Sequence, residues 1–341
     1  MGEAPTMAVG KAEAQHPERA AETGHSFEAP CFNAIDERAI KDHLARDHFF
    51  WLDLTAPSSE DIERLRELFH FHPLALEDVQ HFGQRPKLDH YQDYIFLVFY
   101  GAHEVSENAS EMLHEVQMFV SGKYLVTIHK DELPILDEQR KHLDGLLLHS
   151  EQFLLYRVFD ALTDSFFPPL SRMDDEIDEL EVAVLEGPTD EQLQRLFAMK
   201  RSLVSMRKVL TPQRDLFARS IDQIADLPGL QLDERDYFRD VYDHLIRISD
   251  LIDSYRDLLS STTDLYLSTV SNRQNEVMKQ LTIVGTIFLP LSFITGFFGM
   301  NFGWMVNTAI APTWTFFVLG IGSMLLTCLI LVRFFRRKGW M

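Results

Sequence analysis

A stripe of small and hydroxylated side chains follows one face of an uncharged segment near the C-terminus. The members are spaced by three or four residues, so they share one side of an α-helix. The stripe consists of Thr282, Gly285, Leu289, Ser292, Gly296 and Gly299, and continues backwards to Met278 and Asn275. Small residues allow membrane helices to pack closely. The same stripe can also form the wall of a pore shared by several copies, because two helices of one chain cannot enclose a water-filled path. Both interpretations remain open from these residues alone.

Acidic side chains are abundant, with 52 Asp and Glu against 32 Lys and Arg and a formal net charge of −20. This balance argues against a nucleic-acid partner, which favours a basic surface. It is compatible with a protein that meets cations, and equally with solubility alone. The 14 histidines show no Cys/His spacing of the zinc-site kind, so none is assigned to a metal by spacing.

Sequence motifs of the common enzyme classes are absent. There is no Gly-rich phosphate loop, no nucleophile elbow and no His-Glu metal helix motif. Only two cysteines occur, Cys31 and Cys328, which excludes a disulfide framework and indicates a soluble part built for a reducing compartment. We therefore expect a protein that is not an enzyme.

Two uncharged segments near the C-terminus predict transmembrane helices, at 281–298 and 313–332. They have 18 and 20 residues, enough to cross a hydrocarbon core of about 30 Å. The connecting segment 299–312 carries no charge, whereas Arg333, Arg336, Arg337 and Lys338 follow the second span. The positive-inside rule then places both termini in the cytoplasm, the loop outside and 333–341 as a basic cytoplasmic tail.

The region before the spans reads as a soluble domain. Residues 29–150 combine expected strands at 51–54 and 93–100 and a hairpin of 115–120 with 124–129, together with a helix that Ser58 and Asp61 begin as a capping box. This pattern predicts a cytoplasmic α/β domain. Residues 1–28 contain no apolar stretch and are expected to be a disordered N-terminal tail.

The pattern then turns helical. Residues 151–232 are expected to form a helical hairpin region, with one helix over 153–185 and a second that ends near Leu210. Residues 233–280 contain neither proline nor glycine and repeat apolar residues every seven positions. They predict a long stalk helix that continues into the first of two transmembrane helices.

The run 266–301, YLSTVSNRQNEVMKQLTIVGTIFLPLSFITGFFGMN, resembles the CorA family of magnesium and cobalt channels. The signature of that family is Gly-Met-Asn at the end of the first transmembrane helix. Two upstream segments, 72–99 and 237–248, also resemble the family. The resemblance covers nearly the whole chain from about residue 45 onward.

The resemblance implies a funnel-shaped homopentamer in the lipid bilayer of the cytoplasmic (inner) membrane. In this arrangement Gly299, Met300 and Asn301 form the selectivity filter, and the first transmembrane helices line the pore. A ring of neutral Asn301 oxygens can hold hydrated Mg²⁺ without stripping its waters. The pore-lining residues are then Asn275, Met278, Leu281, Thr282, Gly285, Leu289, Ser292 and Gly296. Among them, Met278, Leu281 and Leu289 are expected to form a hydrophobic constriction.

The resemblance also implies regulation by intracellular Mg²⁺ bound between subunits. The paired acids of the family map onto Asp78 and Asp240, and Glu77, Asp164 and His244 are weaker candidates for a nearby second site. Mg²⁺ is thus expected as both transported and regulatory ion, with Co²⁺ or Ni²⁺ as further transported ions.

One departure concerns the loop after the signature. Many magnesium channels of the family have Met-Pro-Glu-Leu there, whereas this chain has no acid before Pro312. Two alternatives to a Mg²⁺ channel follow: a zinc transporter like the ZntB branch, which usually varies the Gly-Met-Asn tripeptide, and a membrane-anchored sensor. The intact tripeptide favours magnesium or cobalt.

Overall fold

The computed structural model describes residues 30–103, 112–143, 151–225, 235–300, 303 and 313–340. The predicted tail 1–28, Asn301 and most of the predicted loop 299–312 lie outside the described residues. The chain divides into two compact units, which are described separately. The first comprises 1–175 with 198–257, and the second comprises 176–197 with 258–341.

A six-stranded sheet forms the centre of the first unit, in the order β1-β2-β6-β5-β4-β3. The three strands β1, β2 and β6 are parallel, and the pairs β6-β5, β5-β4 and β4-β3 are antiparallel. The strand bounds are β1 Cys31–Phe32, β2 Phe50–Thr55, β3 Lys87–His90, β4 Ile95–Ala102, β5 Leu113–Val120 and β6 Tyr124–His129. The strands expected from sequence correspond to β2, β4, β5 and β6, so the predicted α/β domain is confirmed.

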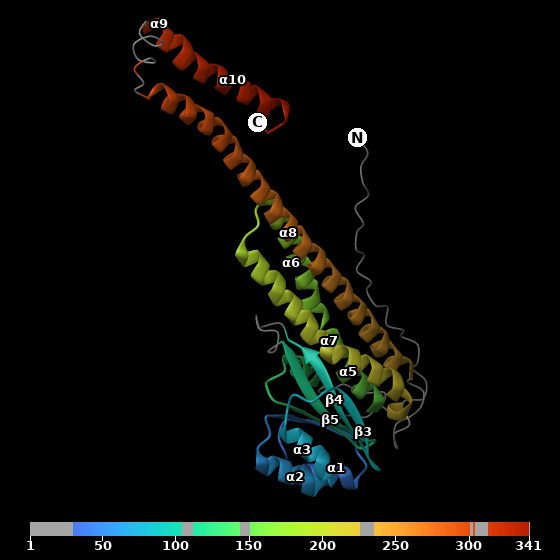
Figure 1. Cartoon of the computed structure of the whole chain (residues 1–341). Helices are drawn as coiled ribbons and strands as arrows, with labels where there is room; N and C mark the ends of the chain where they lie inside the picture. Colours follow the sequence, from blue (N-terminus) through green and yellow to red (C-terminus); the bar gives the residue numbers. More distant parts are fainter. Residues whose placement is uncertain are drawn as a thin grey trace. The chain divides into compact units, whose positions relative to one another are not determined.

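Helices cover both faces of this sheet (Figure 1). Three short helices lie on one side: α1 Glu37–Ala45, α2 Ser59–Phe69 and α3 Pro73–Gln80. On that side Phe71 stacks on Phe119 of β5, with ring centroids 3.8 Å apart. The predicted capping box begins α2, since Ser58 and Asp61 exchange both hydrogen bonds. Helix α4, Pro134–Leu143, follows β6.

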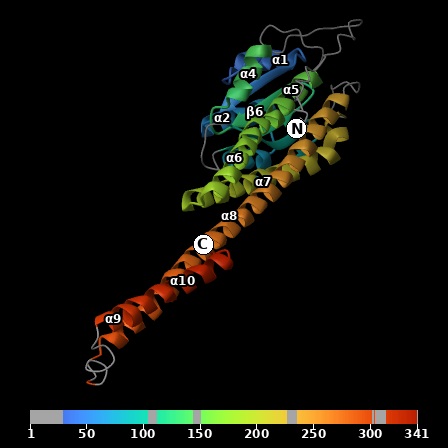
Figure 2. The same cartoon turned by 90° about the horizontal axis from the view of Figure 1, so that it is seen from above.

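The other face of the sheet packs on α5, Glu151–Asp164, and on the first-unit parts of two longer helices (Figure 2). These are α7, Asp190–Ala225, and α8, Arg235–Phe298. Phe99, Phe159, Phe217 and Phe238 form an aromatic cluster there, each no more than 1 % exposed. Apolar burial of this size contributes a large share of a domain's stability.

Two helix boundaries differ from the sequence prediction. The helix expected over 153–185 is two helices, because α5 ends at Asp164 and α6 spans Phe167–Glu186. The prolines in the first turn of α6 cannot donate to the last carbonyls of α5, so the helix breaks before them. The helix expected to end near Leu210 instead runs through Pro212 to Ala225. Buried Gln213 and Phe217 anchor the turn after the proline and offset its cost.

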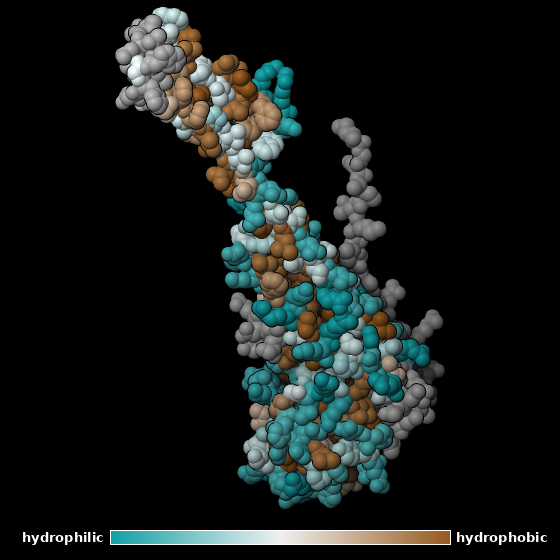
Figure 3. Space-filling view, viewed as in Figure 1, coloured by the Kyte–Doolittle hydropathy of each residue, from teal (hydrophilic) through white to brown (hydrophobic). Residues whose placement is uncertain are grey.

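The second unit contains the C-terminal part of α8, then α9 Thr313–Thr315, a π-helical turn η3 Phe316–Ile321, and α10 Gly322–Arg337. Its α8 segment and the helix from Phe317 to Arg337 are both long and apolar enough to cross a membrane. None of the apolar window of α8 is buried within the chain. Figure 3 shows the resulting apolar surface over α8 and α10. The predicted continuation of the stalk into the first span is confirmed, since α8 is one helix.

Candidate functional site

The C-terminal part of α8 has two contrasting faces. The stripe predicted from sequence is exposed along its whole length: Asn275, Met278, Thr282, Gly285, Leu289, Ser292, Gly296 and Gly299. The remaining predicted pore-lining residue, Leu281, is exposed as well. The half-buried positions are Ile283, Ile287, Pro290, Leu291, Ile294 and Phe298. At 3.6 residues per turn the two sets lie about 180° apart. The rest of the chain therefore partly covers one face and leaves the remainder of the helix surface, the stripe included, open.

Within the stripe, polar atoms accompany the apolar ones. The Thr282 hydroxyl donates to the Met278 carbonyl at 2.7 Å, which commits its hydrogen and leaves oxygen lone pairs as acceptors. Leu289 is 74 % exposed, and nothing lies within 4 Å of a side-chain carbon placed on Gly285 or Gly296. The open face thus alternates hydroxyls, bare backbone and large apolar side chains.

The end of α8 places the first two residues of the predicted filter. The Gly299 amide donates to the Thr295 carbonyl at 3.0 Å, and Met300 to Phe297 at 3.3 Å. A side-chain carbon on Gly299 would lie 3.2 Å from the Thr295 carbonyl, which is tight. Glycine therefore suits the last turn of this helix.

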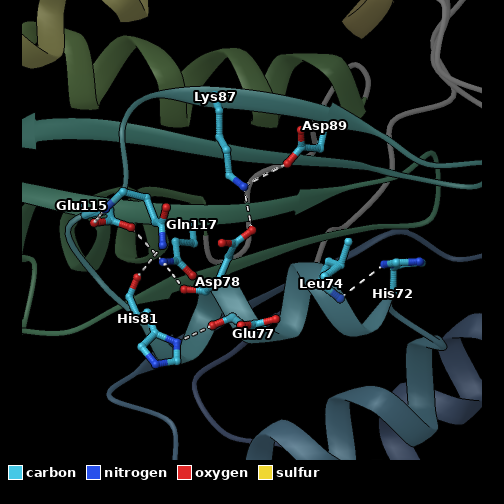
Figure 4. Close-up of polar contacts among 10 residues, drawn as sticks. His72, Leu74, Glu77, Asp78, His81, Lys87, Asp89, Glu115 and Gln117 are labelled. Atoms are coloured by element: carbon cyan, nitrogen blue, oxygen red, sulfur yellow. Dashed lines mark hydrogen bonds and ion pairs between the residues drawn. The ribbon is translucent and has the colours of Figure 1, made fainter.

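A second group surrounds Asp78, near the C-terminal end of α3 (Figure 4). Lys87 Nζ lies 2.6 Å from Asp78 Oδ2 and 3.0 Å from Asp89 Oδ2. Burial opposes the charge of Lys87, but the hydrogen bonds that its ammonium donates to the carboxylates of Asp78 and Asp89 outweigh this effect and raise the pKa of the lysine. Lys87 is therefore a firmly charged ammonium between two acids. Glu77, the neighbouring candidate, is exposed.

Buried polar side chains of β5 support the end of α3. Gln117 is fully buried and donates to the backbone carbonyl of Asp78 at 3.1 Å and to Glu115 Oε1 at 2.7 Å. The amides of Gly83 and Gln84 in turn donate to Glu115 Oε2 at 2.5 and 3.0 Å. These bonds fix the backbone of α3 and of the loop that follows it.

A third group joins α5 to the first-unit part of α8. Within the described part of the chain, Asp160, Asp164 and His244 form a set of ligand atoms all within 4.8 Å of one another. His244 Nδ1 lies 2.7 Å from Asp164 Oδ1 and 3.7 Å from Asp160 Oδ1. Asp240 lies beside them, 3.9 Å from His244 Nε2 and 3.3 Å from the Tyr156 hydroxyl, which donates to it.

Two members of this third group, Asp160 and His244, have raised pKa values and so keep their protons to a higher pH than usual. Burial, followed by the charge of Asp164, raises the pKa of Asp160 to about 6. The hydrogen bond with Asp164 raises the pKa of His244 above its usual value, against the effect of burial. A metal ion at this group would have to displace these protons. Carboxylates suit Mg²⁺, and an imidazole adds affinity for transition metals.

The structure brings together three of the five predicted regulatory residues, Asp164, Asp240 and His244. The other two, Glu77 and Asp78, lie on α3, where Asp78 has Lys87 as its partner. Sequence reasoning missed Asp160 and Lys87. The four-residue spacing of Asp160 with Asp164 on one helix, and of Asp240 with His244 on another, was a signal for three acids and a histidine on shared helix faces. No comparable signal existed for Lys87.

These observations define a class: a membrane protein with an acidic α/β domain, a side-chain group that could hold a metal ion, and two helices long and apolar enough to cross a membrane. A family model described as "CorA-like Mg2+ transporter protein" matches residues 46–337. The chain belongs to this family of membrane metal-ion transporters, whose members are not enzymes.

Individual relatives agree with this assignment. The cobalt/magnesium transport protein CorA of Thermotoga maritima is 36 % identical over 297 residues, covering 85 % of this chain and 83 % of the relative. The complete structure of the CorA magnesium transporter from Methanocaldococcus jannaschii matches with a TM-score of 0.74 at 24 % identity, covering 85 % and 91 % of the two chains. The zinc transport protein ZntB of Yersinia enterocolitica is more distant, 24 % identical over 64 % of this chain and 66 % of its own length.

Proposed function

We propose that this protein is a homopentameric channel that passes Mg²⁺, and secondarily Co²⁺ or Ni²⁺, across the cytoplasmic membrane. The observation that carries the proposal is the open stripe on α8. The chain partly covers the opposite face with its own residues and leaves the stripe for other copies and for water. One helix per subunit then lines a central path.

Selection takes place at the end of α8, in a ring of Gly299 carbonyls and Asn301 side chains. Neutral oxygens hydrogen-bond the waters of a hydrated ion, and Mg²⁺ gives up those waters reluctantly. Conduction also requires that the ion can leave, and neutral oxygens hold a divalent ion less tightly than a ring of full charges would. The M. jannaschii and T. maritima proteins are named as magnesium and cobalt/magnesium transporters, which supports the choice of ions.

The closed state is held by large apolar residues of the same stripe. Leu281 and Leu289 are 64 % and 74 % exposed in one chain, and Met278 is 59 % exposed. Five copies of such side chains around a narrow axis exclude water, and an ion cannot pass a dry constriction. Ser292 and Thr282 provide polar steps on either side of Leu289.

Intracellular Mg²⁺ controls opening through Asp78 and Asp240 of adjacent subunits. Their side chains are 23 % and 51 % exposed, so both present carboxylate oxygens at the surface of a single chain, and carboxylate oxygens are ligands that Mg²⁺ accepts. An ion between them offsets their repulsion and stabilises the closed interface. Loss of the ion releases the interface and opens the channel. In this proposal both termini lie on the cytoplasmic side, where the ion concentration is sensed.

The proposal is tested with Asn301→Ala in cells that lack other magnesium uptake systems. We expect Mg²⁺ uptake to fall to background while the pentamer still assembles in detergent. Asn307→Ala, in the same connecting segment, is the matched control and should retain uptake. Normal Mg²⁺ uptake by Asn301→Ala would contradict the proposed selectivity filter.

Zinc transport is the second candidate, because the group of Asp160, Asp164 and His244 offers an imidazole with two carboxylates. Flux of Zn²⁺ and Mg²⁺ through purified protein in liposomes separates the two functions. Faster Zn²⁺ entry at equal concentration would favour the ZntB-like alternative.

A further inference from the structure

Lys87 occupies the position that a metal ion would need at Asp78. Its ammonium lies 2.6 Å from Asp78 Oδ2, and its second partner, Asp89 Oδ2, lies 3.0 Å away on the other side (Figure 4). The three side chains are 31 %, 23 % and 44 % exposed. Solvent and ions therefore reach the group, yet the carboxylate of Asp78 is already neutralised by a cation of the same chain.

The fold holds this lysine in place. Lys87 and Asp89 are two apart on β3 and so point to the same face of the sheet. The ammonium also lies 5.4 Å from the centroid of the Phe96 ring, on the neighbouring strand. On the other side, Gln117 fixes the backbone carbonyl of Asp78. Both partners of the ion pair are thus positioned by the sheet beneath α3.

A divalent ion and an ammonium compete for one carboxylate. An ion bound to Asp78 would stand within a few ångströms of Lys87 Nζ, and like charges at that distance repel. Asp89 offers the ammonium a second partner without breaking the strand. The geometry therefore allows two states, one with Lys87 shared by both acids and one with Lys87 on Asp89 alone.

We propose that Lys87 is a built-in competitor of the regulatory ion at Asp78, and that transfer of its ammonium to Asp89 accompanies Mg²⁺ binding. This inference rests on the proposed regulatory role of Asp78. Lys87 then sets the Mg²⁺ concentration at which the interface closes: it weakens binding enough for the site to empty when intracellular Mg²⁺ falls. Asp89 acts in the opposite sense by drawing the lysine away.

The test uses the full-length pentamer in detergent and follows protection from chymotrypsin as Mg²⁺ is added. Chymotrypsin does not cleave at lysine and cleaves only weakly after methionine, and the control variant below adds a methionine as well. We expect Lys87→Met to lower the half-maximal Mg²⁺ concentration about tenfold, and Asp89→Asn to raise it by a similar factor, the scale on which groups around metal ligands act. Lys123→Met is the matched control, because Lys123 pairs with exposed Asp47 on the same domain and should leave the midpoint unchanged.

A purely structural ion pair gives a different pattern. If Lys87 merely positions Asp78, Lys87→Met weakens the Mg²⁺ response, and this result or an unchanged midpoint overturns the proposal. Asp89→Asn provides the second arm if Lys87→Met folds poorly, since a lower or unchanged midpoint there also overturns it. Asp78→Ala tests the regulatory site separately from the role of Lys87. If this variant retains the full Mg²⁺ response, the proposed regulatory site is wrong. If it loses the response, the site stands whatever the lysine variants show.

Discussion

The soluble unit and the apolar end of α8 differ in how far one chain completes them. In the soluble unit, the buried carboxylate of Asp53 has several partners: it accepts from Thr127 at 2.5 Å, pairs with His129 at 3.0 Å and lies 3.5 Å from Arg140. On α8, large apolar residues of the first span remain exposed. The first region is stabilised within one chain, whereas the second leaves an apolar surface for lipid and, in the proposed pentamer, for further copies. Substitutions should therefore affect stability in one region and conduction in the other.

Removal of a core aromatic tests the first half of this comparison most strongly. Phe217→Ala deletes a fully buried ring packed on Phe99 and Phe159, and should cost about 3–5 kcal/mol. The thermal unfolding midpoint of the detergent-solubilised protein should drop by roughly 10 °C. The control is Val284→Ala on α8, which is 53 % exposed and lies outside the stripe, so a shift within about 0.5 kcal/mol is expected. Equal losses of stability would erase the distinction.

The second-largest loss of stability is expected for the buried acid Asp53. Asp53→Ala leaves His129 and Thr127 without their shared acceptor and Arg140 without one of its carboxylates, and should cost about 3 kcal/mol. Chemical denaturation of the purified protein measures this loss. A neutral result would mean that the polar network is dispensable to the sheet.

A smaller effect is expected at the start of α2. Ser58→Ala removes the capping box with Asp61, which should cost about 1 kcal/mol. The hydrogen bonds from Ser58 also lower the pKa of Asp61, so its carboxylate stabilises the fold above the unfolded pKa and the benefit is lost as acidity increases. The variant should show less acid sensitivity below pH 4 than the parent protein, as followed by circular dichroism.

The smallest effect is a pH dependence from His129. Burial alone would lower the pKa of His129, but its hydrogen bond and charge interaction with Asp53 raise it, with Asp131 adding to and Arg140 opposing this effect. Because the folded pKa lies above the unfolded one, this histidine stabilises the protein below about pH 6.5, and the contribution is lost as pH rises through the folded pKa. His129→Gln should flatten stability between pH 6 and 8. An unchanged slope would assign the dependence to other groups.

Much of the fold could be predicted from the sequence because its signals are local. Apolar β-branched and aromatic runs indicated the strands at β2 and β4. The proline-free run 233–280, followed directly by the uncharged segment 281–298, indicated that the stalk helix continues unbroken into the first span. The continuation of α7 through Pro212 could not be predicted in this way. The helix continues there because Gln213 hydrogen-bonds the backbone of Tyr100, 113 residues away, at 2.8 Å, and such a contact leaves no local trace.

The candidate sites also differ in whether a local sequence signal or a long-range contact defines them. The stripe on α8 follows from helical spacing alone. It is exposed in one chain, and its role as a pore wall stays a prediction. Lys87 was not predicted, because an Arg-Pro-Lys segment indicates nothing about the acid on another element that it will neutralise. Asp160 was missed because only burial against α8 separates it from the many acids on solvated helix faces.

The central claim, that the stripe on α8 lines the pore, is tested most directly by Mg²⁺ flux through Gly285→Leu in liposomes. In one chain nothing lies within 4 Å of a Cβ placed on Gly285, so the variant should fold, and size-exclusion chromatography verifies that it assembles. Val284→Leu, about 100° around the helix, is the control. The account predicts assembled Gly285→Leu pentamers with flux reduced at least about tenfold and near-normal flux for Val284→Leu. Normal flux through assembled Gly285→Leu, or failure of that variant alone to assemble, would contradict the assignment and favour helix packing as the purpose of the stripe.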